Sequence, residues 1–279
     1  MALVNHPDSL RETAIALAEI GGQTAARFFG KVIATRKSDD SPVTEADHAA
    51  QEAILSALSH RHPSHSIVVE EDVLRPDRHA ALTASEYCWI VDPIDGTRNF
   101  SRGVKVYATS IAVMHGGRPV AAAIYDATAD IVFSASLGGG AYRGQERIRL
   151  RDRPIDRDTT VAVGSFRRRS VPQAVRGWLD HFLLRNFGST SLHLAWVATG
   201  LVDAAYSAEC KLWDIAAAAL LIEEAGGIVS DHADQSIWPV DPGEYEGQDL
   251  PVLAGTKTMH GHLVTSLRVD TQPLPTGLG

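Results

Sequence analysis

Cysteine is nearly absent from this chain. Its 279 residues include two cysteines, Cys88 and Cys210, which lie far apart and form no C-x-x-C pair. This excludes a disulfide framework and a cysteine-based zinc site, and it fits the reducing conditions of the cytoplasm. Histidine is more frequent, but none of the twelve histidines shows the H-E-x-x-H spacing of a zinc hydrolase.

Long apolar runs are absent as well. No segment approaches the roughly 18 consecutive apolar residues that read as a membrane-spanning helix. No early segment joins a basic stretch to an apolar one, as a secretion signal does. We therefore expect a cytoplasmic protein without a membrane partner.

Positive charge is in deficit. Lysine and arginine number 26 against 34 aspartate and glutamate residues, so the formal net charge is −8. This charge argues against binding to nucleic acid or to an anionic membrane through the overall field of the protein. If the substrate is an anion, its site needs a local cation.

What the chain does contain is typical of a folded globular protein. Hydrophobic residues make up 44% of the sequence, and no internal repeat or low-complexity linker appears. A chain of this length can form one large domain or two lobes.

The first half predicts two helices followed by strands. Ser9 and Glu12 form a capping-box pattern before apolar residues at helical spacing, and Thr44 and Asp47 form another. Short apolar or alternating runs then predict strands joined by turns, including a turn at the glycines 138–140. The expected strands cover residues 67–69, 89–91, 108–114, 120–125 and 131–135.

The second half alternates helix and strand patterns more evenly. Strands are expected at 161–163, 202–208 and 228–229, and helices at 171–183, 189–199 and 214–225. Together the halves predict a layered α/β (α+β) fold with two lobes that share a cleft. The lobes are an N-terminal α+β lobe at 1–150 and a C-terminal α/β lobe at 151–270, followed by a flexible tail at 271–279.

The segment VDPIDGTRNF, residues 91–100, places two aspartates three positions apart. On a regular strand Asp92 and Asp95 would point to opposite faces, so they can share a ligand only through a bend. Pro93 removes a backbone donor and is expected to end the strand, with a turn after it. Such a turn can direct both carboxylates and the Ile94 carbonyl toward one point, which suits Mg²⁺ or Ca²⁺. An acidic surface turn without a ligand is the alternative.

Other acidic residues lie beside expected ends of helices and strands. They are Asp47, the run at 70–72, and Asp214. Taken singly, each has a structural explanation: Asp47 can cap a helix, Asp214 can complement a helix dipole, and the run can be a solvated loop.

Taken together, these segments resemble the inositol monophosphatase family of metal-dependent, lithium-sensitive phosphatases. The blocks D-P-I-D-G-T and W-D carry most of the resemblance. The matching residues follow in order through most of the chain: Lys37, Ser41-Pro42-Val43-Thr44-Glu45-Ala46-Asp47, Glu70-Glu71, Asp92-Pro93-Ile94-Asp95-Gly96-Thr97, Asn99-Phe100, Gly188-Ser189-Thr190, Trp213-Asp214 and Glu224-Ala225-Gly226-Gly227.

The resemblance implies an αβαβα sandwich of the inositol monophosphatase and fructose-1,6-bisphosphatase type, usually a homodimer. It also implies two or three Mg²⁺ ions per site. Glu70, Asp92 and the Ile94 carbonyl would hold one ion, and Asp92, Asp95 and Asp214 would hold another, with Asp92 bridging. Two ions about 3.5 to 4 Å apart can clamp the attacking and leaving oxygens of a displacement at phosphorus.

The resemblance further implies catalytic roles for Glu70, Thr97 and Asp47. The Thr97 hydroxyl, oriented by Asp47, would position the attacking water and help to deprotonate it. The phosphate would lie against the backbone N–H groups of Gly96 and Thr97. The residues implied in substrate binding are Gly96, Thr97, Gly188, Ser189, Thr190, Glu209 and Asp214.

The implied activity is hydrolysis of a small phosphorylated metabolite, with inositol-1-phosphate as the first choice. Members that hydrolyse inositol phosphates usually carry a glutamate seven positions before the W-D aspartate, and here that residue is Ser207. Glu209 can supply the missing carboxylate. The sequence around Arg98 and at 101–104 resembles histidinol-phosphate phosphatases about equally well. Relatives that act on fructose-1,6-bisphosphate or adenosine 3',5'-bisphosphate share the metal site.

Two further interpretations stay open. The basic run Arg167-Arg168-Arg169 is interpreted as a solvated loop, with contact to a phosphate-bearing ligand as the alternative. Some bacterial relatives act on the transcription apparatus, so a regulatory binding role is the alternative to catalysis.

Overall fold

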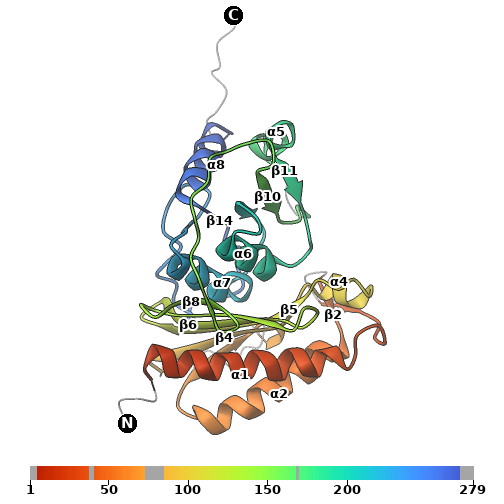
Figure 1. Ribbon diagram of the computed structural model, residues 1–279. Helices are drawn as coiled ribbons and strands as arrows, with labels where there is room; N and C mark the ends of the chain where they lie inside the picture. The colour runs from red at the N-terminus through yellow and green to blue at the C-terminus, as the bar shows by residue number, and fades with distance from the viewer. Residues whose placement is uncertain (1–4, 38–40, 73–84, 168–169, 271–279) are drawn as a thin grey trace, which may run out of the picture.

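A computed structural model describes residues 5–37, 41–72, 85–167 and 170–270 of the chain. The expected flexible tail and the residues Arg168 and Arg169 lie outside the described residues. Layers follow one another in the order helix, sheet, helix, sheet, helix (Figure 1). The helices are α1 (Pro7–Ala26), α2 (Glu45–Arg61), α4 (Thr97–Ser101), α5 (Gln173–Gly177), α6 (Thr190–Thr199), α7 (Leu212–Ala225) and α8 (Lys257–Asp270), with 3₁₀ turns η1 (Glu70–Asp72) and η2 (Trp178–Asp180).

The first sheet is seven-stranded in the described part of the chain. Its strands are, in spatial order, β3 (Ser66–Val69), β4 (Tyr87–Asp95), β5 (Ala108–His115), β6 (Arg118–Asp126), β7 (Ile131–Ser136), β8 (Gly140–Arg143) and β9 (Glu146–Ile148). β3 and β4 are parallel, and every later neighbour is antiparallel, as short turns between consecutive strands require. A separate pair of two-residue strands, β1 (Thr35–Arg36) and β2 (Pro42–Val43), lies beside it.

The second sheet has five strands among the described residues. In spatial order they are β11 (Leu183–Arg185), β10 (Thr160–Val163), β12 (Ala204–Ser207), β14 (Val252–Gly255) and β13 (Ile228–Ser230). β10 runs parallel to β11 and β12, whereas β14 is antiparallel to β12 and β13. The proposed lobe boundary at residue 150 falls between β9 and β10.

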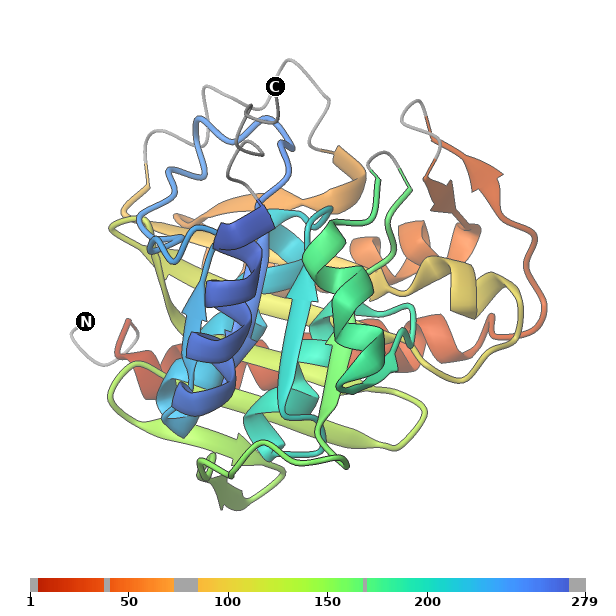
Figure 2. The same ribbon diagram turned by 90° about the horizontal axis from the view of Figure 1, so that it is seen from above.

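Helices cover both faces of each sheet. α1 and α2 pack on the outer face of the first sheet, α6 and α7 lie between the sheets, and α5 and α8 cover the second sheet (Figures 1 and 2). Every residue of α7 from Ile215 to Ile222 is buried, as expected for a helix that is apolar all round. Four of these are alanines, Ala216 to Ala219, which let the helix lie close to both sheets. Among the described helices, none is both long and apolar enough to cross a bilayer.

The first helix begins three residues earlier than its capping-box pattern predicts, because the N-cap is His6 and not Ser9. α1 starts at Pro7, and the ring of His6 accepts a hydrogen bond from the Asp8 N–H. Proline suits the first helical position because its missing N–H has no partner there and its φ is already helical. The predicted N-terminus at Ser9 was therefore wrong.

The predicted helix at 171–183 was also wrong in extent. Only α5 and the single 3₁₀ turn η2 form, and Leu183 begins strand β11. Leu179 is 67% exposed and Leu183 is 40% exposed, so two of the apolar residues that suggested a helix do not face the core. Gly177, a weak helix former, lies where α5 ends.

Candidate active site

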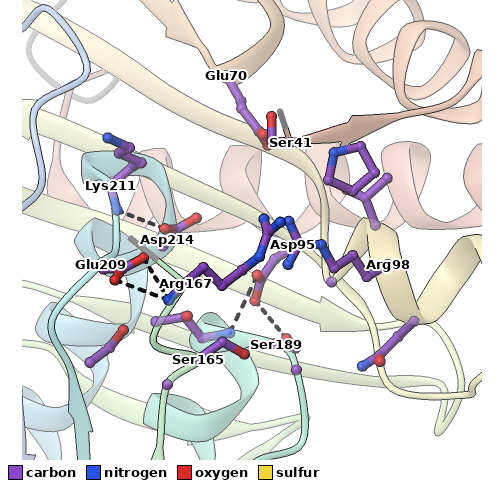
Figure 3. Close-up of a pocket in the computed structure, with 18 of the residues that line it drawn as sticks. Ser41, Glu70, Asp95, Arg98, Ser165, Arg167, Ser189, Glu209, Lys211 and Asp214 are labelled. Atoms are coloured by element: carbon purple, nitrogen blue, oxygen red, sulfur yellow. Dashed lines mark hydrogen bonds between the residues drawn. The ribbon is translucent and has the colours of Figure 1, made fainter. Parts of the chain in front are cut away.

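A cavity of about 700 Å³ brings together residues that are distant in the sequence (Figure 3). Most of the candidate site residues line it: Glu70, Asp95, Gly96, Thr97, Gly188, Ser189, Thr190, Glu209 and Asp214. The remaining candidates, Asp47, Asp92 and Ile94, are buried directly behind this lining.

A β-bulge brings Asp92 and Asp95 onto one face of β4. Asp92 pairs with Ser110 and Asp95 with Ala108, so β4 advances three residues while β5 advances two. One extra residue in a strand reverses the alternation of side chains beyond it. The prediction that the strand ends at Asp92 was therefore wrong, although the predicted change of direction does occur. Pro93 is tolerated because a bulge leaves a residue without a ladder hydrogen bond.

Three carboxylates converge next to the bulge. Single oxygen atoms of Asp92, Asp95 and Asp214 all lie within 4.8 Å of one another. Asp214 is in the first turn of α7, where it accepts the Lys211 backbone N–H at 2.6 Å. The bulged strand β4 thus positions Asp92 and Asp95, and the buried helix α7 positions Asp214.

Asp95 is held by the start of α6. Its carboxylate accepts hydrogen bonds from the hydroxyl groups of Ser189 and Ser191 and from the backbone N–H groups of Thr190 and Ser191. These donors act to lower its pKa, but burial outweighs them and the pKa of Asp95 is raised above its ordinary value.

Asp92 is the least compensated member of the cluster. It is 1% exposed, and its Oδ1 atom has no hydrogen-bond partner among the described residues. Burial, followed by the nearby charges of Glu70, Asp95 and Asp214, raises its pKa well above the ordinary value. Burial and neighbouring carboxylates also raise the pKa of Asp214. Buried, converging carboxylate oxygens of this kind fit a hard divalent cation such as Mg²⁺, which would supply the missing positive charge.

Glu70 lies at the edge of this cluster. It is not one of the three convergent ligands, but its charge contributes to the raised pKa values of Asp92 and Asp214. Lys37 donates hydrogen bonds of 2.7 Å to both Glu70 and Glu71. Burial acts to lower the pKa of Lys37, but the charges of Glu70 and Glu71 outweigh it, so the pKa lies above its ordinary value. Burial and the adjacent Glu70 raise the pKa of Glu71 to about 8.

Asp47 both caps α2 and reaches Thr97. One carboxylate oxygen accepts the Thr44 N–H at 2.7 Å and the Thr44 hydroxyl at 2.6 Å, which confirms the predicted capping box. The other oxygen lies 3.3 Å from the Thr97 hydroxyl, which is also 2.9 Å from the Ile94 carbonyl oxygen. Burial raises the pKa of Asp47 to about 6, although its bonds to Thr44 act in the opposite direction.

The loop before α6 is held by two side chains, Asn99 and His193, to which the sequence analysis gave no role in the site. Asn99 donates to the carbonyl oxygen of Phe187 at 2.6 Å and to that of Val106 at 2.8 Å. His193 accepts the Phe187 N–H at 2.9 Å through Nε2. Asn99 was part of the quoted motif, so its position was visible in the sequence, whereas nothing local marked His193.

Glu209 lies in the cavity, but its carboxylate already has protein partners. Both of its oxygens accept the backbone N–H of Arg167, at 3.1 and 3.2 Å (Figure 3). Ser207, at the end of β12, is 4% exposed and packs against Gly164. Arg167 is exposed in a loop, as the interpretation of its segment as a solvated loop predicted, and it also lines the cavity.

The sequence model described as the inositol monophosphatase family matches residues 6–271. The chain belongs to this family. It is 33% identical over 264 residues to an inositol-1-monophosphatase of Mesorhizobium japonicum, covering 88% of this chain and 91% of that protein. It is 36% identical over 202 residues to a Nus factor SuhB of Xylella fastidiosa, covering 70% of this chain and 71% of that protein.

The known structures agree with this assignment. An inositol monophosphatase from Anabaena superposes with a TM-score of 0.77 at 27% identity, covering 97% of this chain and 99% of that one. These similarities confirm both the family and the αβαβα architecture that the sequence predicted.

Proposed function

We propose that the protein is a Mg²⁺-dependent phosphatase that hydrolyses a small phosphate monoester. The observation that carries this proposal is the convergence of Asp92, Asp95 and Asp214 beside the Thr97 hydroxyl, in a cavity of about 700 Å³. Three converging carboxylates, two of them buried and one of those with an unpartnered oxygen, suit a cation, and a cation allows such an acidic site to accept a phosphate.

The residues that would hold two or three Mg²⁺ ions are Asp92, Asp95, Asp214 and Glu70, with the Ile94 carbonyl. When bound, such ions polarise phosphoryl oxygens and lower the pKa of water. The protein's own contribution is to fix these ligands through the bulge and the first turn of α7, and to keep the cavity polar.

Thr97 and Asp47 are the proposed proton-handling pair. The Thr97 hydroxyl would accept a hydrogen bond from the attacking water, while Asp47, whose carboxylate lies 3.3 Å from that hydroxyl, would orient it. The backbone N–H groups of Gly96 and Thr97 would hold the phosphate.

Inositol-1-phosphate is the first substrate to test, because one relative carries the name inositol-1-monophosphatase. Glu209, with Gly188, Ser189 and Thr190, would contact the rest of the substrate. Histidinol phosphate, fructose-1,6-bisphosphate and adenosine 3',5'-bisphosphate are the alternatives. We further propose that the protein is cytoplasmic, for the reasons of composition given above, and that it is a homodimer, as the family resemblance implies.

The test is phosphate release from these four compounds with and without Mg²⁺, by the natural protein and by Asp92→Asn. We expect Mg²⁺-dependent release that the substitution abolishes, since Asp92 would contact more than one ion. A second readout is the melting temperature, which Mg²⁺ should raise in the natural protein more than in Asp92→Asn. Full activity in a folded Asp92→Asn variant would contradict the proposal.

A relative named Nus factor SuhB favours a second candidate, binding within the transcription apparatus. If no compound is hydrolysed while Mg²⁺ still stabilises the fold, this binding role becomes the better account. If Mg²⁺ neither stabilises the protein nor supports hydrolysis, the proposed metal site itself is wrong.

A further inference from the structure

Two neighbouring side chains of β5, Thr109 and Ser110, hold backbone groups next to the carboxylate cluster. Each residue is only 1% exposed. Because side chains alternate along a strand, the two hydroxyl-bearing side chains point to opposite faces of the first sheet. Thr109 faces the layer of α1, where its methyl group lies close to Gly21, and Ser110 faces α7. The proposed function gives neither residue a role.

Thr109 holds the bulge of β4 from the neighbouring strand. The bulge between Asp92 and Asp95 places two residues of β4 opposite Thr109 alone. The Thr109 hydroxyl donates a buried hydrogen bond of 2.8 Å to the carbonyl oxygen of Pro93, which lies within the bulge. A bulge interrupts the regular ladder of hydrogen bonds, and a side-chain donor can replace a missing partner. Thr109 therefore stabilises the irregular backbone that brings both aspartates to one face.

Ser110 connects the same part of the sheet to α7. It is the direct cross-strand neighbour of Asp92, and its hydroxyl donates to the carbonyl oxygen of Trp213 at 3.2 Å. Trp213 precedes Asp214, so this bond links β5 to the turn of helix that supplies the third carboxylate. A hydroxyl has a single proton to donate, and here it goes to Trp213. The Oδ1 atom of Asp92, which has no partner among the described residues, is thus left for a cation.

We propose that Thr109 and Ser110 are positioning residues for the metal-binding carboxylates: the first fixes the bulge, and the second fixes the spacing between the bulge and α7. This inference rests on the proposed function, because it assumes that the carboxylate cluster binds Mg²⁺. Mg²⁺ requires short bonds in a nearly octahedral arrangement, so a change in the spacing of its ligands weakens binding. Hydrogen-bonding residues behind the ligands of a metal typically affect its affinity by about 10- to 100-fold.

Titration with Mg²⁺ tests this role without any substrate. Thr109→Val and Ser110→Ala each remove one hydroxyl group, and we expect each to raise the dissociation constant for Mg²⁺, measured by calorimetry, by about tenfold or more. Thr109→Ser keeps the hydroxyl, so it should bind Mg²⁺ as the natural protein does. At a fixed Mg²⁺ concentration, the increase in melting temperature should be smaller for Thr109→Val and Ser110→Ala than for the natural protein.

Ser66→Ala is the matched control. Ser66 is also buried in the first sheet, and its hydroxyl donates to the carbonyl oxygen of Tyr87 at 3.2 Å, the same distance as in the bond of Ser110. It lies at the start of β3, at the other end of that strand from Glu70. Its loss should lower the melting temperature measured without Mg²⁺ and leave the affinity for Mg²⁺ unchanged.

Failure of this inference and failure of the proposed function give different results. If Thr109→Val and Ser110→Ala only lower the melting temperature, as Ser66→Ala does, and bind Mg²⁺ normally, the positioning role is overturned and the metal site stands. If the natural protein binds no Mg²⁺, both are overturned. If the affinities follow the expected order but no phosphate ester is hydrolysed, the positioning role holds and the phosphatase activity is wrong. Each variant removes a separate hydrogen bond, so if one does not fold, the other decides.

Discussion

His193 provides a pH-dependent test of how the loop before α6 is held in place. This side chain lies in α6, is 2% exposed, and accepts the Phe187 N–H through Nε2. Only the neutral imidazole with its proton on Nδ1 can accept this hydrogen bond. Burial lowers the pKa of His193 to about 4, so the neutral form predominates in the folded protein at neutral pH.

The direction of the effect follows from proton linkage. Because the folded-state pKa is lower than the unfolded one, the unfolded chain binds more protons below about pH 6.5. The stability that neutral His193 contributes is complete above this pH and is lost as the pH falls toward about 4. The separation of the two pKa values corresponds to about 3 kcal/mol. Replacing the acceptor leaves the partly buried Phe187 N–H unpaired, which costs about 1 to 3 kcal/mol.

The variants His193→Phe and His193→Gln separate the hydrogen bond from the packing. We expect the natural protein to exceed His193→Phe in unfolding free energy by about 1 to 3 kcal/mol at neutral pH. That difference should shrink as the pH falls from about 6.5 toward about 4, because the unfolded natural chain then binds a proton at His193 that the folded protein does not. His193→Gln keeps an acceptor that does not titrate, so its difference from His193→Phe should not change with pH.

Urea unfolding at a series of pH values measures these differences. Using differences between variants cancels the contributions of other titrating groups, including His65, whose pKa burial lowers to about 4. A constant gap between the natural protein and His193→Phe over the whole pH range would refute the reasoning. It would mean that His193 is not a buried neutral acceptor.

Three further substitutions test the site. Thr97→Ala should lower kcat by about 10² to 10⁴ with little change in Mg²⁺ affinity by calorimetry, and Thr97→Ser should recover most of the rate. Glu209→Ala should impair inositol-1-phosphate by about 1 to 3 kcal/mol in apparent transition-state free energy, and an aryl phosphate less; equal losses would argue against a substrate contact. Gly164→Ala should destabilise the protein by about 1 to 3 kcal/mol, because the new Cβ would lie 2.4 Å from the Ser207 hydroxyl oxygen. Adding Ser207→Gly should recover part of this in thermal unfolding, and no recovery would exclude that clash as the cause.

Local signals in the sequence predicted the parts of the site that depend on local structure. The Thr44 and Asp47 capping box is complete within four residues, so it could be predicted without knowing the fold. The helix that carries Asp214 was also predicted from local signals, namely its apolar pattern and the glycines that end it. It begins at Leu212, two residues earlier than predicted. The family resemblance supplied the layered fold, which periodicity alone left as two lobes around a cleft.

Features that depend on pairing between distant segments were not predictable in this way. The bulge at Pro93 exists only in relation to β5, whose residues begin more than ten positions later. The strands β8, β9 and β14 and the helix α8 were missed, and the helical pattern at 171–183 gave way to packing of Trp178 and Phe182 against the second sheet. His193 enters the site from α6, so no local pattern identified its position, whereas the basic run at 167–169 had marked Arg167 without showing that it lines the cavity.

The position of the carboxylate cluster depends on two features of the fold, the bulge in β4 and the packing of α7 between the sheets. Asp92 and Asp95 reach the same face only because β4 gains a residue, and Asp214 joins them only because α7 is packed between the sheets. Packing that brings these groups together also removes their water, which raises all three pKa values. A cation bound among them would relieve this cost, and by mass action it would stabilise the folded state over the unfolded chain. If the proposed function holds, stability and catalysis depend on the same carboxylates. A variant that folds well without Mg²⁺ is then expected to have lost some of the negative charge that binds the metal.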